Sequence, residues 1–182
     1  SGKYIFQAVK DLGYEAQLID YPKNFSSHQL TEEDFIFIAL HGQDGESGAL
    51  QKLLQQKCIP FSGSHYQACV NTWNKNTCKV LLKNNKIPTP NWITIPSLLE
   101  MEKDLESPFF DQLRPFNELF LKPAEDGSSI DVFRISCNKD LEDAIADSVD
   151  PRRAFILEES IDFKELTVPI LSGRCLPAIE IK

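Results

Sequence analysis

The apolar positions of residues 1–72 switch repeatedly between helical and extended spacing. Six apolar residues in a row at 35–40 are too few to span a membrane and predict a strand buried on both faces. Because strands that alternate with helices are typical of a parallel sheet, we predict a doubly wound α/β domain. The predicted elements are helices at 1–12 and 47–57 and strands at 15–20, 35–40 and 58–61. A crossover helix normally follows a strand, so we expect the first strand to lie upstream of Ser1.

Residues 73–182 have a different pattern. Two prolines within residues 87–90 exclude a helix there and predict an extended linker. Extended segments then follow one another with short turns between them, which favours an antiparallel sheet. We expect its helices on one side, giving an α+β architecture. The predicted elements are helices at 73–85 and from 138 onward, and strands at 92–95, 119–123, 130–136, 154–157, 165–171 and 175–181.

Composition narrows the class of partner. With 27 acidic and 19 basic residues the formal net charge is −8, which argues against nucleic acid or an anionic membrane as the main partner. No apolar run has the length of a membrane span. The five cysteines are scattered, form no Cys-x-x-Cys pair, predict no zinc site and fit a reducing cytoplasm.

The end of the predicted strand at 35–40 is a first candidate site. His41 follows the strand, three glycines fall within residues 42–48, and a helical pattern begins there. Ligands of open α/β sheets bind at such strand ends, and a helix N-terminus offers free N–H groups to an anion. Since His41 and Glu46 can hold a proton or a charge, this corner predicts a site for a small anion or zwitterion. The competing interpretation is a structural corner with His41 packed at its edge.

A second candidate site lies around Lys122. Lys122 ends a predicted strand, and the small residues Gly127-Ser128-Ser129 follow it in a loop. Backbone N–H groups of such a loop can contact phosphate oxygens while a lysine supplies a point charge. Lys75, in the first turn of its predicted helix, could reach the same phosphates. The competing interpretation is a solvated lysine before an ordinary turn.

Some acidic residues favour a nucleotide site and others argue against it. Glu158, at a strand end, could accept hydrogen bonds from an adenine amino group, and Glu165 could bind ribose hydroxyls. The competing interpretation of each glutamate is surface charge on an acidic protein. Asp126 and Asp131 flank the loop after Lys122 and would repel phosphate. If the two candidate sites share a cleft, group transfer from ATP to a small acid is the chemistry that they favour.

Seven stretches carry a family resemblance. They are His41-Gly42 through Gly45-Glu46-Ser47-Gly48 with Gln51; Ile59-Pro60-Phe61-Ser62-Gly63-Ser64; Asn74-Lys75; Ile87-Pro88-Thr89-Pro90; Leu121-Lys122-Pro123; Gly127-Ser128-Ser129; and Leu157-Glu158-Glu159 with Glu165-Leu166-Thr167-Val168. In order and spacing, over essentially the whole chain, they resemble the D-alanine–D-alanine ligases, ATP-grasp enzymes of cell-wall synthesis. The resemblance implies a pre-ATP-grasp domain at 1–72, a central ATP-grasp lobe at 73–157 and the start of a C-terminal lobe at 158–182.

The resemblance also implies an activity and its residues. ATP phosphorylates the carboxylate of one D-alanine, and the amine of a second attacks the acyl phosphate, for peptidoglycan precursor synthesis. Catalytic and substrate-binding roles are implied for His41, Glu46 and Ser128. The implied ATP contacts are Lys75, Lys122 and Ser129 at the phosphates, Glu158, Glu159 and Ile161 at the adenine, and Glu165 at the ribose. Mg²⁺ is the implied cofactor, with ligands expected downstream of Lys182, and a cytoplasmic homodimer is implied.

The chain departs from the family pattern at several positions. Ser47 and Asn74 stand where the family usually has aspartate. Ile130-Asp131 follow the serines where the family has Val-Gly, and an aspartate there opposes closure of the loop over phosphate. Pro169 requires an edge position or a bulge in its strand. Two alternatives therefore remain open: a carboxylate–amine ligase with another acceptor, such as D-lactate, and a nucleotide-binding module without catalysis.

Overall fold

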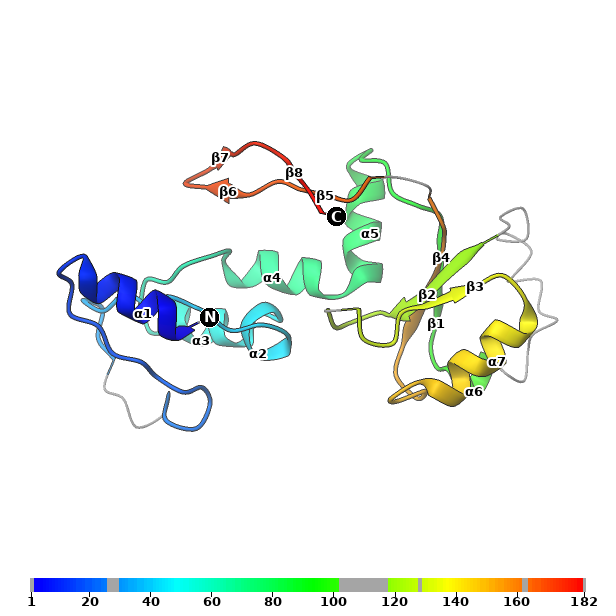
Figure 1. Ribbon diagram of the computed structural model, residues 1–182, viewed down its shortest axis with the longest axis horizontal. Helices are drawn as coiled ribbons and strands as arrows, with labels where there is room; N and C mark the ends of the chain where they lie inside the picture. Colours follow the sequence, from blue (N-terminus) through cyan, green and yellow to red (C-terminus); the bar gives the residue numbers. More distant parts are fainter. Residues whose placement is uncertain (1, 26–29, 102–117, 128, 162–163, 182) are drawn as a thin grey trace.

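The computed structural model describes residues 2–25, 30–101, 118–127, 129–161 and 164–181. The helices are α1 (Gly2–Asp11), α2 (Gln43–Glu46), α3 (Ala49–Gln56), α4 (Tyr66–Trp73), α5 (Lys75–Asn84), α6 (Leu98–Met101) and α7 (Asn138–Asp147). The strands are β1 (Trp92–Ile95), β2 (Leu119–Pro123), β3 (Phe133–Ile135), β4 (Phe155–Glu159), β5 (Leu166–Thr167), β6 (Ile170–Leu171), β7 (Arg174–Cys175) and β8 (Ile179–Glu180). Figure 1 shows the helices α1–α3 at one end of the molecule and the sheet β1–β4 at the other.

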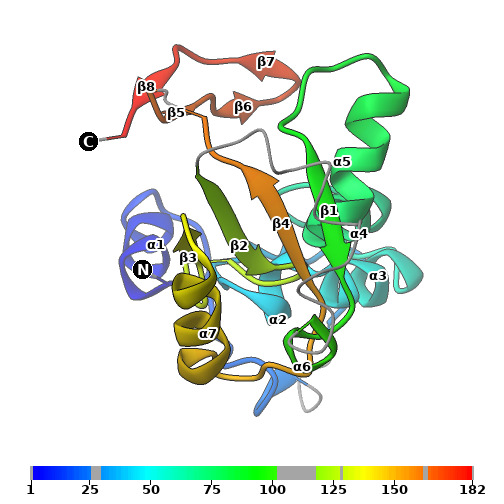
Figure 2. The ribbon, with the colours of Figure 1, turned by 90° about the vertical axis from the view of Figure 1, so that its right-hand side faces the viewer.

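The main sheet confirms the antiparallel architecture predicted for the second half of the chain. Its strand order is β1-β4-β2-β3, and each neighbouring pair is antiparallel (Figure 2). The central pair, β2 and β4, aligns Lys122 with Ile156 and Phe120 with Glu158. Side chains alternate between the faces of a sheet, so Lys122 and Glu158 lie on the same face as diagonal neighbours.

Helices cover both faces of this sheet, so the prediction of helices on one side is wrong. One face packs against α6 and α7 through a core that includes Leu98, Leu121 and Leu141. On the opposite face, Asn76 of α5 accepts hydrogen bonds from Trp92 Nε1 at 2.8 Å and Thr94 Oγ1 at 3.0 Å. The physical reason lies in β4, whose apolar residues Phe155, Ile156 and Leu157 run without interruption and are all buried.

No strand longer than a single bridge forms within the described part of residues 2–72, so the strands predicted at 15–20, 35–40 and 58–61 are wrong as regular strands. Ile36 and Phe61 form one parallel bridge, in which Ile36 N–H donates to Pro60 O at 2.9 Å. At the next pairing position, Ile38 N–H donates to the Ser62 hydroxyl at 2.9 Å. A side chain thus takes the place of a backbone partner and ends the ladder.

The helices predicted in this region are confirmed as α1 and α3, with a short addition. A four-residue helix, α2, forms where the glycine loop was expected. Gly45 of α2 is buried so tightly that a Cβ there would lie 2.5 Å from Leu40 O. Gln51 of α3 donates to Gly45 O at 2.6 Å and binds the two helices together. Leu50, Leu54 and Ile59 form the small core below them.

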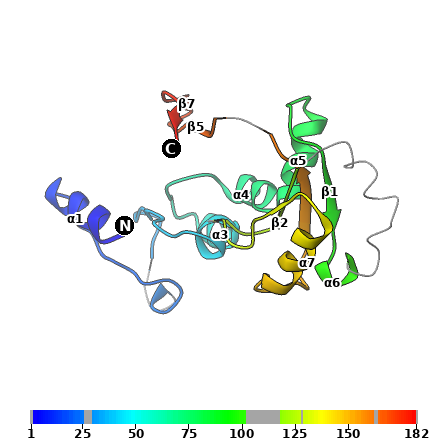
Figure 3. The same ribbon diagram turned by 45° about the vertical axis from the view of Figure 1, so that its right-hand side comes forward.

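Both ends of the described chain lack buried residues. Helix α1 buries none of its residues, and Figure 3 shows it far from the sheet, with α3 and α4 between them. The two strands predicted at 165–171 and 175–181 are confirmed as a hairpin, split into the pairs β5–β8 and β6–β7. Pro169 lies at the split, where its missing N–H interrupts the ladder and its carbonyl accepts from Leu176 N–H at 2.8 Å.

Candidate active site

The N-terminus of α5 is attached to the loop that follows β2. Asn74 caps the helix, because its Oδ1 accepts a hydrogen bond from Thr77 N–H at 3.0 Å. Lys75 is then the first helical residue, and its backbone N–H donates to Ala124 O at 2.7 Å. Its ammonium group donates to Asp126 O, also at 2.7 Å. These contacts place the Lys75 side chain beside the end of the strand that carries Lys122.

A buried carboxylate joins two further lysines on the α5 side of the sheet. Glu158 on β4 forms an ion pair with Lys79 Nζ at 2.9 Å through Oε2, and its Oε1 contacts Lys122 Nζ. Lys79 lies one helical turn after Lys75, so both lysines face the sheet. Lys79 also donates to Thr89 Oγ1 at 2.9 Å, which ties the linker after α5 to this cluster.

The electrostatics of the cluster favour an anionic ligand. Burial acts to raise the pKa of Glu158, but the ammonium groups of Lys122 and Lys79 hold this pKa below its ordinary value. The pKa of Lys75 is lowered, first because burial disfavours its charge and second because Lys122 repels it. Two ammonium groups, those of Lys79 and Lys122, thus pair with one buried carboxylate, while the third, that of Lys75, is attracted by Asp126 as well as by Glu158. A phosphate oxygen near Lys75 and Lys122 would relieve this excess of positive charge.

The aspartates that the sequence predicts to repel phosphate are paired with an arginine. Arg153 Nη2 forms an ion pair with Asp131 Oδ2 at 2.6 Å, and Arg153 Nη1 contacts Asp126 Oδ2. Asp131 also accepts hydrogen bonds from Ser148 Oγ and Val149 N–H, both at 3.0 Å. The arginine thus offsets much of the negative charge beside the loop, and the expected repulsion is correspondingly weaker.

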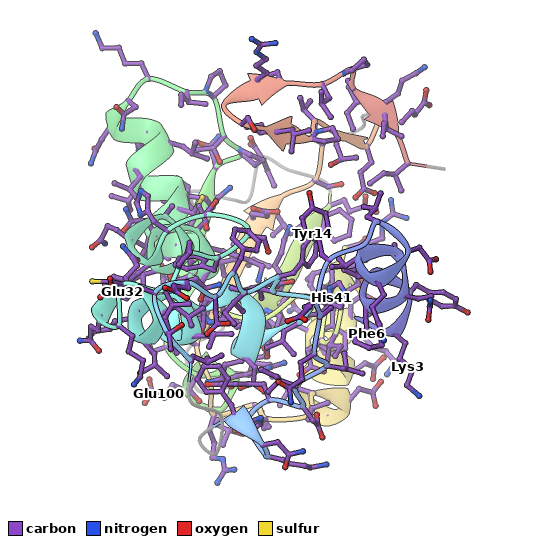
Figure 4. The ribbon with its side chains drawn as sticks, turned by 90° about the vertical axis from the view of Figure 1, so that its left-hand side faces the viewer. Lys3, Phe6, Tyr14, Glu32, His41 and Glu100 are labelled. Atoms are coloured by element: carbon purple, nitrogen blue, oxygen red, sulfur yellow. The ribbon has the colours of Figure 1, made fainter. Side chains whose placement is uncertain are left out.

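The N-terminal corner and the loop that follows β2 border a common cavity of about 310 Å³. Gln43 of α2 lines it from one side, and Asp126 and Arg153 line it from the other. Glu46 extends the contact, because its Oε2 lies 3.7 Å from where a Cβ on Gly127 would be. His41 is exposed and is labelled in Figure 4. The two candidate regions are therefore neighbours in space.

The structure brings together only some of the predicted site residues. Lys75, Lys122 and Glu158 lie together in the cluster described above. Glu159 instead accepts hydrogen bonds from the backbone and side-chain nitrogens of Asn91, each at 3.0 Å, and so ties the end of β4 to the start of β1. The other described members are all exposed: His41, Glu46, Ser129, Ile161 and Glu165. Ser128 lies outside the described residues.

Sequence reasoning missed Lys79, Asn76 and Arg153. The spacing of four residues between Lys75 and Lys79 on a predicted helix was an available signal, since such residues share a face. Asn76 and Arg153 had no comparable signal, because their partners are distant in the chain.

Within the part of the chain that the structure describes, no group of three or more His, Cys, Asp or Glu side chains could hold a metal ion. The described residues therefore do not by themselves fit Mg²⁺. In the same part of the chain, no helix combines the length and apolar character needed to cross a membrane.

Comparison with solved structures defines the class of the fold. A D-alanine–D-alanine ligase from Bacillus anthracis superposes with a TM-score of 0.70 at 27% sequence identity, covering 94% of this chain and 54% of that one. The enzyme from the same organism complexed with ATP gives a TM-score of 0.65 at 30% identity, over 81% of this chain and 48% of that one. The sheet with its lysine cluster accordingly belongs to an ATP-grasp domain.

Sequence comparison gives the family. Residues 81–182 match the family described as "D-ala D-ala ligase C-terminus". The chain is 32% identical over 185 residues to the D-alanine–D-alanine ligase of Glaesserella parasuis, and 35% identical over 195 residues to that of a Synechococcus species. This chain therefore belongs to the D-alanine–D-alanine ligase family. It is aligned in full but spans only 58% and 56% of the length of these two relatives.

Proposed function

We propose that this protein catalyses the ATP-dependent ligation of two D-alanines through an acyl-phosphate intermediate. The observation that carries the proposal is the pairing of Lys79 and Lys122 with the buried Glu158, with Lys75 close enough to be repelled by Lys122. The loop after β2, to which Lys75 is bound, borders one cavity together with Gln43 of the N-terminal corner. Membership of the D-alanine–D-alanine ligase family supports the choice of substrates.

In the proposed first step, a carboxylate oxygen of one D-alanine attacks the γ-phosphorus of ATP, and the bond to the β–γ bridging oxygen breaks. Negative charge then develops on the transferring phosphoryl group and on the leaving ADP. The ammonium groups of Lys75 and Lys122 stabilise this charge, because they are held in place before the reaction. His41 and Glu46 are proposed to hold the D-alanine, with Glu46 available to pair with its ammonium group.

In the second step, the amine of another D-alanine attacks the acyl carbon, and the acyl C–O bond breaks. Inorganic phosphate leaves, and the nitrogen loses a proton as the peptide bond forms. Binding both amino acids in one cleft turns a bimolecular encounter into an effectively unimolecular step. Ser128 is proposed to contact or order the substrate.

The remaining nucleotide contacts follow the family resemblance. We propose that Ser129 closes its loop over the phosphates, that Glu165 binds the ribose, and that Glu158, Glu159 and Ile161 meet the adenine. The oxygens of Glu158 each accept from one lysine and retain a lone pair for a further donor.

Mg²⁺ as cofactor, assembly as a homodimer and a cytoplasmic location also belong to the proposal. So does an N-terminal α/β domain at 1–72, in whose described residues the parallel pairing is limited to the bridge between Ile36 and Phe61. The two ATP-grasp parts are proposed at 73–157 and 158–182, although their boundary falls inside β4.

The proposal predicts that phosphate release from ATP by the full-length protein, with Mg²⁺ present, depends on D-alanine. Lys122→Ala should lower kcat/KM by about a hundredfold or more, since it removes the ammonium group that stabilises the negative charge of the transferring phosphoryl group. Lys139→Ala is the matched control, because Lys139 is exposed on α7 and pairs with Asp143. Release that does not depend on D-alanine, or full activity in Lys122→Ala, would reject the proposal. Replacing the second D-alanine by D-lactate tests the alternative acceptor.

A further inference from the structure

The described residues of the loop after β2, 124–127 and 129–131, have an unusual backbone for their residue types. Asp126, Ser129 and Asp131 have φ angles of 94°, 58° and 55°, in the left-handed region that residues other than glycine rarely adopt. Such a conformation persists only where surrounding contacts hold it in place. The carbonyl that receives the Lys75 ammonium belongs to one of these three residues, Asp126.

Arg153 spans this loop from the turn before β4. Its two terminal nitrogens contact different carboxylates, Nη1 that of Asp126 and Nη2 that of Asp131. The guanidinium carbon lies 5.5 Å from the ring centre of Phe155, which is completely buried in the core of the sheet. The arginine is therefore held by a rigid element and joins both ends of the loop to it.

Asp131 extends the attachment to a second element. Its side chain is only 5% exposed, and its carboxylate accepts from Ser148 Oγ and from Val149 N–H just after α7. A carboxylate with these partners has its charge directed away from solvent and into a network of donors. In this structure the aspartate is thus an anchor for the loop.

We propose that Arg153 is a positioning residue that, through Asp126 and Asp131, fixes the loop carbonyl that binds Lys75 and so holds Lys75 in place for phosphate. This inference rests on the proposed function, because it assigns Lys75 to the phosphates of ATP. Arg153 acts through the loop in this proposal, since both of its terminal nitrogens are already engaged by carboxylates.

The test compares binding of two ligands to the full-length protein by calorimetry: the ATP analogue AMP-PNP with Mg²⁺, and adenosine, which lacks phosphates. Arg153→Ala should weaken AMP-PNP binding by about tenfold and leave adenosine binding unchanged, because only the phosphates contact Lys75. Arg153→Lys should restore part of the loss, since a lysine keeps the charge but lacks the planar fork that reaches two carboxylates. Arg152→Ala is the control, because Arg152 is exposed and pairs with Asp150.

Three outcomes overturn the inference in distinguishable ways. If Arg153→Ala binds AMP-PNP as wild type does while Lys75→Ala does not, the positioning role is wrong and the phosphate site stands. If Arg153→Ala weakens adenosine and AMP-PNP equally, its role is general stability. If neither Lys75→Ala nor Lys122→Ala weakens AMP-PNP binding, the proposed phosphate site fails and the inference fails with it.

Asp131→Asn keeps the inference testable if Arg153→Ala does not fold. It removes the charge that Arg153 contacts but retains the size of the side chain. We expect about threefold weaker AMP-PNP binding with adenosine binding unchanged. Tighter or unchanged AMP-PNP binding would instead mean that Asp131 repels phosphate or is neutral, and would overturn the inference.

Discussion

The sheet region and the N-terminal region satisfy their polar groups in different ways. In the sheet β1–β4, every strand pairs along its length, and the buried Glu158 has two lysine partners. In the N-terminal region, residues 35–40 have one parallel bridge, and a serine hydroxyl takes the next N–H. This difference indicates that the proposed phosphate site is held by a fully paired sheet. The proposed D-alanine site at His41 and Glu46 depends instead on a few contacts around α2.

The largest expected effect tests this difference in rigidity. Phe155→Ala in β4 should lower the free energy of unfolding by about 3–5 kcal/mol, because the ring is fully buried and its loss leaves a cavity. Phe35→Ala is the matched control in the N-terminal region, where the ring is 62% exposed, and should cost less than about 1 kcal/mol. Denaturant unfolding of both variants measures this. Equal losses would contradict the contrast between the two regions.

A smaller effect concerns the buried ion pairs. Glu158→Gln should lower the free energy of unfolding near neutral pH by about 2–4 kcal/mol, because it leaves Lys79 and Lys122 without their carboxylate. Since the pKa of Glu158 is depressed in the folded state, its contribution is complete above the ordinary pKa of 4.5. It is lost as the pH falls through the folded value.

Unfolding measured against pH therefore checks the sign of this linkage. The stability difference between wild type and Glu158→Gln should shrink as the pH falls below about 4.5. Glu142→Gln, on the exposed side of α7, should leave the pH profile unchanged. A difference that grows on acidification would show that the carboxylate is not stabilised in its charged form.

The smallest effect concerns the fit of α2 against the end of residues 35–40. Gly45→Ala should cost about 1–3 kcal/mol, since the new Cβ would lie 2.5 Å from Leu40 O and α2 must shift. Gly127→Ala is the control, because a Cβ there would meet its nearest atom at 3.7 Å. Thermal unfolding of both variants measures the cost, and an unchanged melting temperature for Gly45→Ala would mean that α2 is free to move.

Much of the fold could be predicted from local patterns. The helical spacing of α1, the strand ending at Lys122 and the hairpin split at Pro169 are encoded by neighbouring residues, because period and turn chemistry act over short distances. At residues 35–40 the local pattern gave a wrong prediction, because strand pairing does not depend on local residues alone. The apolar run has the composition of a parallel strand, but a strand also needs backbone partners from distant parts of the chain.

Of the candidate site, Lys75, Lys122 and Glu158 could be identified from the sequence, and the structure brings them together. The interpretation of Asp131 as a source of repulsion changed, because its charge is paired with Arg153. That pairing depends on where the turn before β4 lies relative to the loop after β2. No periodicity reports a contact between residues 22 positions apart.

The sequence by itself determined most of the helices, the strands of the second half of the chain and the stretches that carry family-specific residues, since these depend on local spacing and residue type. The tertiary structure decided which charges pair. Long lysine and arginine side chains can reach several carboxylates, and strand register together with burial selects among them. Glu158 between two lysines and Arg153 between two aspartates are outcomes of that selection.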